Sequence, residues 1–138
     1  QWDYSLLQHE LALESSTHHE VFARLKGLLR IRRRQAAFHP NATQFTLHLG
    51  TALFGYWRQS MDRRQSIFCI SNVTLEPQRL DLASINLTDT QDWIDLISLL
   101  ELVHGDSIEL LPYQTVWISN VPDTQASSTS PAPSPSAA

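Results

Sequence analysis

The sequence predicts a mainly β protein that begins with helices: an antiparallel β-domain preceded by a helical segment. Three observations predict this fold class. Apolar residues recur with helical spacing up to about residue 40. From Thr43 onward they alternate with polar residues, as along half-buried strands. Short turn segments then separate the alternating runs, which is typical of antiparallel sheets.

The chain divides into three parts by this pattern. We assign residues 1–40 to the helical segment, 41–119 to the antiparallel β-domain and 120–138 to a tail. The tail is rich in Ser, Thr, Pro and Ala and has almost no apolar anchor, so we expect it to be disordered. The first residue is Gln1 and not Met, and we therefore expect the chain to be the C-terminal end of a longer protein.

Two helices are predicted in the first part. Asp3 precedes an apolar run and is the expected N-cap of a short helix. Thr17 and Glu20 have the spacing of a capping box and predict the start of a second helix over 18–36.

The second helix has one apolar face. Five apolar side chains share one arc of the helix, and they are Val21, Phe22, Leu25, Leu28 and Leu29. Arg32 falls near the centre of this arc, and two interpretations stay open. Its stem packs while the guanidinium reaches solvent or a carboxylate, or this face docks on another domain. Arg32, Leu25 and Leu28 are thus the candidate interface residues.

A hairpin is predicted to open the β-domain. A two-residue turn at Gly50 and Thr51 would place Leu47 opposite Phe54 and Phe45 opposite Tyr56, with these side chains pointing into the core. The other predicted elements are a turn at 61–64, a central strand at 65–72, an edge strand at 78–82 after a proline, and a closing hairpin of 107–111 with 114–119. Residues 83–106 could be strand or helix.

No catalytic, cofactor-binding or metal-binding residue is predicted. Phosphate-loop, dinucleotide and nucleophile-elbow motifs are absent, and the six histidines lack ligand spacing. Five carboxylates cluster in the sequence, and they are Asp92, Asp95, Glu101, Asp106 and Glu109. No pocket-forming pattern surrounds them, although a glycosidase needs two carboxylates about 5–10 Å apart across a cleft.

Composition and charge limit the partners and the compartment. The net charge is −4, and residues 41–138 hold four basic and ten acidic residues, so nucleic acid is not an expected partner. No apolar run is long enough to predict a membrane span. The single Cys69 lies in an apolar run and is expected to be a buried thiol, which favours a cytoplasmic protein.

Two tryptophans and three sequons have a functional and a structural interpretation. Trp57 and Trp117 alternate out of register with the side chains that are predicted to face the core. They would either stack on a sugar or cover a second apolar layer of a two-sheet sandwich. The sequons at Asn41, Asn72 and Asn86 are interpreted as chance matches, because no secretory signal is seen.

Five segments together resemble, in order, the C-terminal end of sucrose-phosphorylase-like enzymes, which are members of the α-amylase superfamily in glycoside hydrolase family 13. They read QWDYSLLQHEL, VFARLKGLLRIRRRQAAFHPNATQ, IFCISNVTLEPQ, WIDLIS and LPYQTVWI. Residues 33–42 and the PYQ…W pattern carry the most specific part of the resemblance. It covers residues 1–119.

The resemblance implies a parent enzyme with a TIM barrel whose last helix leads directly into an antiparallel β-domain. Residues 18–37 would be that last helix. The implied reaction transfers the glucosyl group of sucrose or a related glucoside to phosphate with retention, through an aspartate nucleophile and a glutamate acid/base. These catalytic residues would lie in the barrel, upstream of this chain. One departure stands out: the family's DLLSG-like turn reads Asp95-Leu96-Ile97-Ser98 here, without the glycine.

The leading hypothesis is therefore a non-catalytic structural domain of such an enzyme, whose partner is the upstream barrel of the same polypeptide. A free-standing carbohydrate-binding module using Trp57 or Trp117 is one alternative. A protein-interaction module whose basic helix binds an acidic partner is another.

Overall fold

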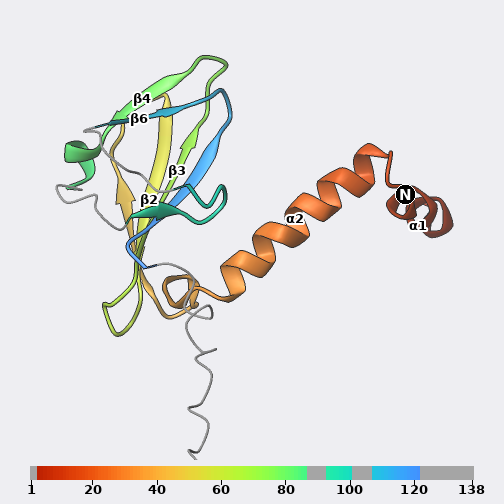
Figure 1. Cartoon of the computed structure of the whole chain (residues 1–138), viewed down its shortest axis with the longest axis horizontal. Helices are drawn as coiled ribbons and strands as arrows, with labels where there is room; N and C mark the ends of the chain where they lie inside the picture. Colours follow the sequence, from red (N-terminus) through yellow and green to blue (C-terminus); the bar gives the residue numbers. More distant parts are fainter. Residues whose placement is uncertain (1–2, 87–92, 101–106, 122–138) are drawn as a thin grey trace, which may run out of the picture. The chain divides into compact units, whose positions relative to one another are not determined.

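The computed structural model describes residues 3–86, 93–100 and 107–121, which fall into two compact units (Figure 1). The first unit ends at Arg33 and the second begins at Arg34. Residues 34–40, which the sequence pattern assigned to the helical part, therefore belong with the β-strands. The predicted disordered tail lies outside the described residues, apart from its first two positions, and so do Asp92, Glu101 and Asp106 of the carboxylate cluster.

The helical unit contains α1 (Tyr4–Ala12) and α2 (Thr17–Arg33). Asp3 is confirmed as the N-cap of α1. Its Oδ1 accepts hydrogen bonds from the backbone N of Ser5 at 2.9 Å and of Leu6 at 3.4 Å. These contacts satisfy backbone donors that have no partner within the helix.

The predicted capping box of α2 is wrong by one residue. Ser16, not Thr17, accepts the backbone N–H of His19 on its Oγ at 3.0 Å, and its carbonyl accepts the backbone N–H of Glu20. The Glu20 carboxylate pairs with Arg24 at 2.6 Å rather than with the cap. The Ser16 hydroxyl also donates a hydrogen bond to the backbone carbonyl of Glu10, in α1, so the residue that caps α2 also connects the two helices.

The β unit is a two-layer antiparallel sandwich (Figure 1). Its elements are η1 (Ala36–Phe38), β1 (Thr43–Leu47), β2 (Leu53–Gln59), β3 (Ser66–Asn72), β4 (Gln78–Asp81), η2 (Leu82–Ile85), β5 (Ile94–Asp95), β6 (Ser107–Leu110) and β7 (Thr115–Ser119). One sheet has the order β1-β2-β3-β7-β5, and β4 pairs with β6 in the other. The predicted antiparallel β-sandwich preceded by helices is confirmed.

A single apolar core lies between the two sheets. The larger sheet contributes side chains of β2, β3 and β7, and the smaller sheet and η2 contribute the opposite layer. The core residues are Leu53, Phe68, Ile70, Leu80, Leu82, Ile85, Leu110, Val116 and Ile118. The predicted central strand is confirmed by β3, where Ile67 to Ile70 are buried on both faces of the sheet.

The register of the first hairpin differs from the prediction by one residue. Phe45 pairs with Trp57 and Leu47 with Gly55, and residues 48–52 connect the two strands. A slip of one residue reverses the face of every side chain on the strand, so Phe54 is 55% exposed instead of facing the core. In this register Gly55 lies opposite Leu47, and the Cδ1 of Leu49 lies 2.6 Å from where a Cβ of residue 55 would be.

The predicted closing hairpin is also wrong. β6 pairs with β4 and β7 pairs with β3, so the chain changes sheets at the turn instead of folding back within one. The turn itself lies where it was expected, with the backbone N of Gln114 donating to the carbonyl of Leu111 at 3.0 Å. A short run bounded by a turn shows where strands end, but not which sheet each one joins.

Candidate functional site

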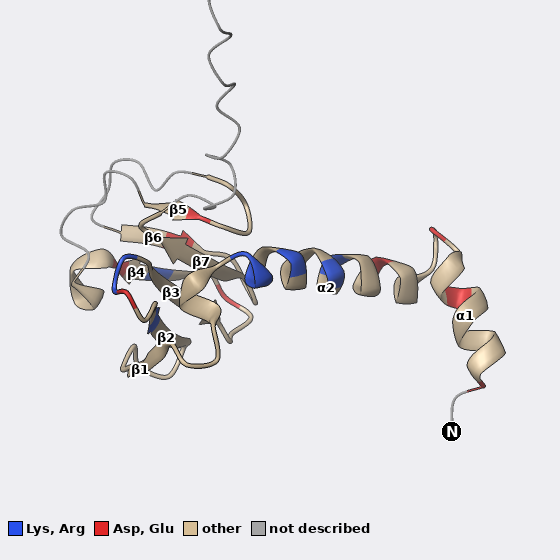
Figure 2. Cartoon of the chain, turned by 90° about the horizontal axis from the view of Figure 1, so that it is seen from below, with Lys and Arg blue, Asp and Glu red and all other residues tan. Residues whose placement is uncertain are grey.

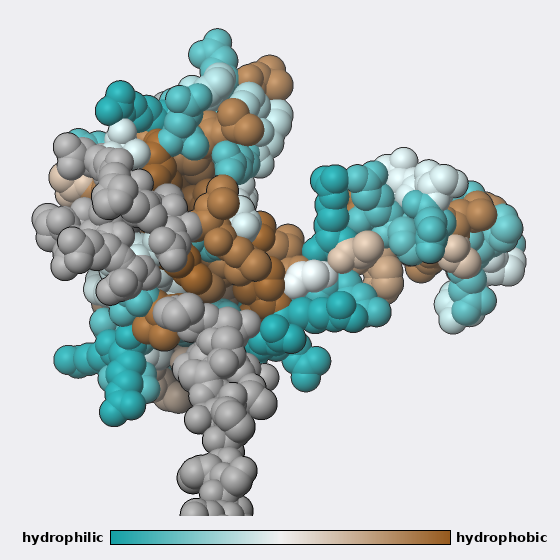
Figure 3. All heavy atoms as spheres, in the orientation of Figure 1, coloured by the Kyte–Doolittle hydropathy of each residue, from teal (hydrophilic) through white to brown (hydrophobic). Residues whose placement is uncertain are grey.

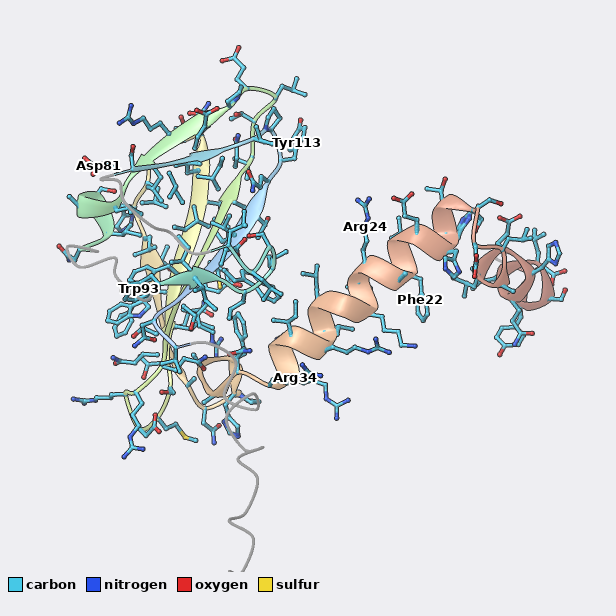
Figure 4. The ribbon with its side chains drawn as sticks, viewed as in Figure 1. Phe22, Arg24, Arg34, Asp81, Trp93 and Tyr113 are labelled. Carbon is cyan, nitrogen blue, oxygen red and sulfur yellow. The ribbon has the colours of Figure 1, made fainter. Side chains whose placement is uncertain are left out.

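The apolar face of α2 has no partner among the described residues. No residue of this helix is buried. Val21 is 61% exposed, Leu25 52% and Phe22 50%, while Leu28 is half-buried. Phe22 and Arg24 project from different sides of the helix (Figure 4). Exposed apolar side chains gathered on one face are typical of an interaction surface.

Basic residues follow this face toward the end of α2 (Figure 2). Arg30, Arg32 and Arg33 lie in the last turn, where positive charge complements the helix dipole. Arg32 is exposed and makes no ion pair with any residue that the structure describes. The interpretation in which a carboxylate of this chain pairs with Arg32 therefore finds no support within the described part.

Trp57 lies on the core face of the larger sheet, contrary to the predicted alternation. Its indole stacks on Phe45 with ring centroids 4.8 Å apart and on Phe68 at 5.7 Å. These phenyl rings belong to the strands on either side of β2, so they occupy the two flanks of the indole. The indole Nε1 is buried and has no hydrogen-bond partner within the described part of the chain. A side chain held in this way contributes to the core and does not present a flat surface to a sugar.

Trp117 lies on the opposite face of the sheet, where η1 covers it. Its ring meets Phe38 edge-on at a centroid distance of 5.0 Å and an interplanar angle of 62°. Arg58 fixes the same segment, because its guanidinium donates to the carbonyls of Ala37 and His39, each at 2.8 Å. The indole therefore anchors the segment that enters the β unit.

A buried glutamine pair completes this junction. Gln35 and Gln65 are each 4% exposed, and the Gln65 amide N donates to Gln35 Oε1 at 2.6 Å. The Gln65 side-chain oxygen accepts the backbone N–H of Ala37 at 2.9 Å. Sequence reasoning did not select Arg58, Gln35 or Gln65, although two of the residues they hold lie in the AFHPNA stretch. Their role depends on contacts between distant segments.

Asp95 organises the turn that follows β5. Its Oδ1 accepts the backbone N–H of Trp117 at 2.8 Å, and its Oδ2 accepts the Ser98 hydroxyl at 2.7 Å. Leu99 has a φ of 61°. It occupies the position of the glycine in the DLLSG-like pattern, so the backbone keeps the conformation that glycine would adopt freely. A leucine in that region costs about 1–2 kcal/mol.

No catalytic constellation occurs among the described residues. Asp95 is buried and fully used in hydrogen bonds, and Glu109 is an exposed residue of β6. No group of three or more potential metal ligands gathers in the described part. Burial raises the pKa of the Cys69 thiol to about 11, so this cysteine is not a nucleophile at neutral pH.

The sequon at Asn72 has a structural role. Its amide donates to the carbonyls of Glu76, Leu110 and Leu111 at 2.7, 3.2 and 3.0 Å, and its Oδ1 accepts from Thr74. The residue is 2% exposed. An amide nitrogen with three acceptors in a buried site is not available for glycosylation.

Comparison with curated proteins finds one informative relative. The chain is 33% identical over 112 residues to a glucosylglycerate phosphorylase of Allomeiothermus silvanus. The match covers 81% of this chain and 17% of that enzyme, so the chain spans about a sixth of its relative. No family model matches the sequence. None of the described helices combines the length and the apolar character needed to cross a membrane.

Solved structures share the fold. AmyP in complex with maltose superposes with a TM-score of 0.61 at 14% identity, over 75% of this chain and 21% of AmyP. The MUTB F164L mutant from crystals soaked with trehalulose gives 0.56 at 17% identity, over 81% and 19%. The trehalose-6-phosphate hydrolase TreA of Bacillus licheniformis gives 0.51 at 16% identity, over 81% and 20%.

The sequence match and the fold matches agree with each other. The sequence match is to a glucosylglycerate phosphorylase, and the proteins that share the fold include AmyP, solved in complex with maltose, and a trehalose-6-phosphate hydrolase. In each case this chain covers about a fifth or less of the larger protein. The chain thus resembles the C-terminal region, helices followed by a β-domain, of sucrose-phosphorylase-like enzymes in glycoside hydrolase family 13 of the α-amylase superfamily.

Proposed function

We propose that this chain is the non-catalytic C-terminal structural domain of a retaining enzyme that transfers a glucosyl group from a glucoside to phosphate. The observation that carries the proposal is the 33% identity to a glucosylglycerate phosphorylase. Sucrose or a related glucoside would be the donor, and glucose 1-phosphate and the freed alcohol would be the products. The chemistry is assigned to the upstream barrel, because the described residues hold no catalytic pair.

The partner of the chain in this proposal is that barrel, within the same polypeptide. The relative is about six times as long as the matched segment, which leaves room for a barrel of roughly 250 residues. The apolar face of α2, with Leu25 and Leu28, would pack on it. Arg32 would then meet a carboxylate of the barrel, since a guanidinium at the centre of a buried face needs an ionic or hydrogen-bonding partner.

The division of the chain follows the same proposal. The helices, up to Arg33, would close the barrel, and the β-domain predicted over 41–119 would begin earlier, with residues 34–40, which lie in the β unit. We place the enzyme in the cytoplasm, since a lone buried thiol and a phosphate co-substrate fit a reducing, phosphate-containing compartment. No cofactor is required for the proposed transfer, because the two carboxylates of a retaining enzyme suffice.

An activity assay tests the proposal. The polypeptide encoded together with its upstream sequence is incubated with phosphate and with sucrose or glucosylglycerate, and glucose 1-phosphate release is measured. We expect turnover by the longer polypeptide and none by the 138-residue chain. Release by the 138-residue chain would refute its non-catalytic role, and inactivity of the longer polypeptide on every glucoside would refute the assignment to a phosphorylase.

A matched pair of variants tests the role of the α2 face. In the longer polypeptide, Leu25→Asp places a charge in the proposed interface, whereas Lys26→Asp places the same side chain on the neighbouring position, toward solvent. We expect Leu25→Asp to lower the thermal unfolding midpoint and Lys26→Asp to leave it nearly unchanged. Equal effects would show that α2 does not dock through this face.

The packing of the two tryptophans argues against the alternative of a free-standing carbohydrate-binding module. Trp57 is stacked between phenyl rings, and Trp117 contacts Phe38. Saturable quenching of tryptophan fluorescence by maltooligosaccharides would restore that alternative.

A further inference from the structure

The turn after β5, residues 96–100, presents two adjacent leucines to solvent. Leu99 is 74% exposed and Leu100 68%. Leu96, at the start of the same turn, is 2% exposed and anchors the turn in the β unit. Apolar side chains gather on the visible face of the β unit (Figure 3). Two exposed leucines side by side form an apolar projection that water solvates poorly.

Several hydrogen bonds hold the backbone of the turn that carries these leucines. The backbone N of Leu99 donates to the carbonyl of Asp95 at 2.7 Å, and the backbone N of Asp95 donates to the carbonyl of Leu100 at 2.9 Å. The Asp95 carboxylate also accepts the backbone N–H groups of Ile97 and Ser98, each at 3.2 Å. A surface fixed before binding loses little conformational entropy when a partner covers it.

Leu99 has an unfavourable backbone conformation, and its side chain makes no buried contact within the described residues that would compensate for it. Its φ of 61° lies in the left-handed region that favours glycine. Strain of this kind persists where surrounding contacts or function maintain it. The side chain is largely in solvent, so packing inside the β unit does not explain why a leucine stands there. A contact outside the described residues would explain it.

The position of the turn indicates what that partner is. Trp117 donates its backbone N–H to Asp95 and accepts the backbone N–H of Leu96 at 2.9 Å. The indole of the same residue contacts Phe38, in the segment through which the chain enters the β unit. The turn is thus bonded to the residue that meets the entry segment, the point at which the preceding part of the polypeptide connects to the β unit.

We propose that the β5 turn docks, through Leu99 and Leu100, on the domain that precedes this chain in the same polypeptide. The inference rests on the proposed function, which places a barrel there. The occupant is apolar, because the two leucines bring no charge to the contact. The contact is separate from the α2 face and gives the β unit its own attachment to the preceding domain.

Cysteine labelling tests the docking directly. Leu100→Cys and Arg63→Cys are made in the longer polypeptide, and their rates of alkylation by a maleimide are compared. Arg63 is exposed and also has a positive φ, of 60°, in the turn between β2 and β3, so it is a matched control. The native Cys69 gives little background, because it is 2% exposed and its pKa is raised to about 11.

We expect labelling of the Leu100→Cys variant to be roughly tenfold slower than labelling of the Arg63→Cys variant in the longer polypeptide, because only transient opening exposes a docked site. In the 138-residue chain both positions should react at similar rates. Equal rates in the longer polypeptide would overturn the proposal. Protection in the 138-residue chain that increases with its concentration would also overturn it, because the occupant would then be a second copy.

A glycine substitution gives a second, independent measurement. Leu99→Gly relieves the backbone strain and removes the docking side chain. We expect it to raise the thermal midpoint of the 138-residue chain by about 2–4 °C and to lower that of the longer polypeptide. Arg63→Gly should raise both midpoints. If Leu99→Gly raises both as well, the side chain has no partner and the proposal is wrong.

The outcomes separate this inference from the proposed function. Release of glucose 1-phosphate by the longer polypeptide, together with free labelling at position 100, would refute the docking alone. Protection at position 100 in a longer polypeptide that acts on no glucoside would refute the phosphorylase assignment and leave the docking in place.

Discussion

The helical unit and the β unit of this chain differ in where their apolar side chains lie. In the β unit, nine buried apolar residues from both sheets form one core. In the helical unit, neither helix has a buried residue. Both units have regular secondary structure, so hydrogen bonding does not distinguish them. The difference shows that the β unit has an apolar core of its own, whereas the described helices leave their apolar side chains largely exposed.

The largest expected effect comes from one truncation in each unit. Ile70 is fully buried in β3. We expect Ile70→Ala to lower the free energy of unfolding by about 2–5 kcal/mol. Leu25→Ala should cost less than about 0.5 kcal/mol in the 138-residue chain, because exposed positions contribute little. Urea unfolding followed by circular dichroism measures both. A cost at Leu25 comparable to that at Ile70 would break the comparison.

A buried hydrogen-bond centre should give the next largest effect. Asn72→Ala leaves three carbonyls of the β unit without their donor, and we expect a loss of about 2–3 kcal/mol. Asn41, exposed in the segment before β1, is the control, and Asn41→Ala should change the unfolding free energy very little. The same urea titration checks both variants. Equal losses would show that Asn72 does not join the β3, β4 and β6 segments.

The pH dependence of the β unit is expected to carry a contribution from Cys69. Burial raises the pKa of this thiol from 9.0 to about 11. The unfolded thiol therefore ionises first, and the stability from this group, complete below pH 9, is lost as the pH rises from 9 through 11. The loss should reach about 2–3 kcal/mol, because each pKa unit corresponds to about 1.4 kcal/mol. Cys69→Ala should remove this part of the pH dependence, and an unchanged profile would contradict the prediction.

The smallest effect concerns the start of α2. Ser16→Ala removes the hydroxyl that accepts the His19 N–H, and we expect a loss of about 1 kcal/mol of helix stability. Thr17→Ala, one position later, should have almost no effect. Far-UV circular dichroism of the 138-residue chain during heating reports the helices. A larger loss at Thr17 would reinstate the capping box that the sequence pattern favoured.

Local patterns were read correctly where neighbouring residues decide the structure. The Asp3 cap, the turn before β3 and the burial of β3 on both faces follow from residues close together in the sequence. Errors arose where distant residues compete. The pairing of β1 with β2 brings Leu49 against Gly55, and alternation alone does not reveal such a contact.

The candidate site shows the same division. The apolar face of α2 was visible as a periodic pattern, and the structure leaves it exposed. Trp57 was selected as a sugar-stacking candidate because the predicted register of β1 and β2 placed it away from the core. The observed register places it on the core face of the sheet. The junction of Arg58, Gln35 and Gln65 was missed, since hydrogen bonds between segments about 20 to 30 residues apart leave no periodic signal.

The sequence by itself determined the class of this protein: helices, then an antiparallel β-domain, and a resemblance to family 13 enzymes that a 33% identical relative confirms. Periodicity and turn residues are local properties, so they can be recognised from the sequence alone. Only the tertiary structure decided the pairing of β6 with β4, the burial of Trp57 and the left-handed Leu99. Each of these depends on the free energy of packing and hydrogen bonding between segments that the fold brings together.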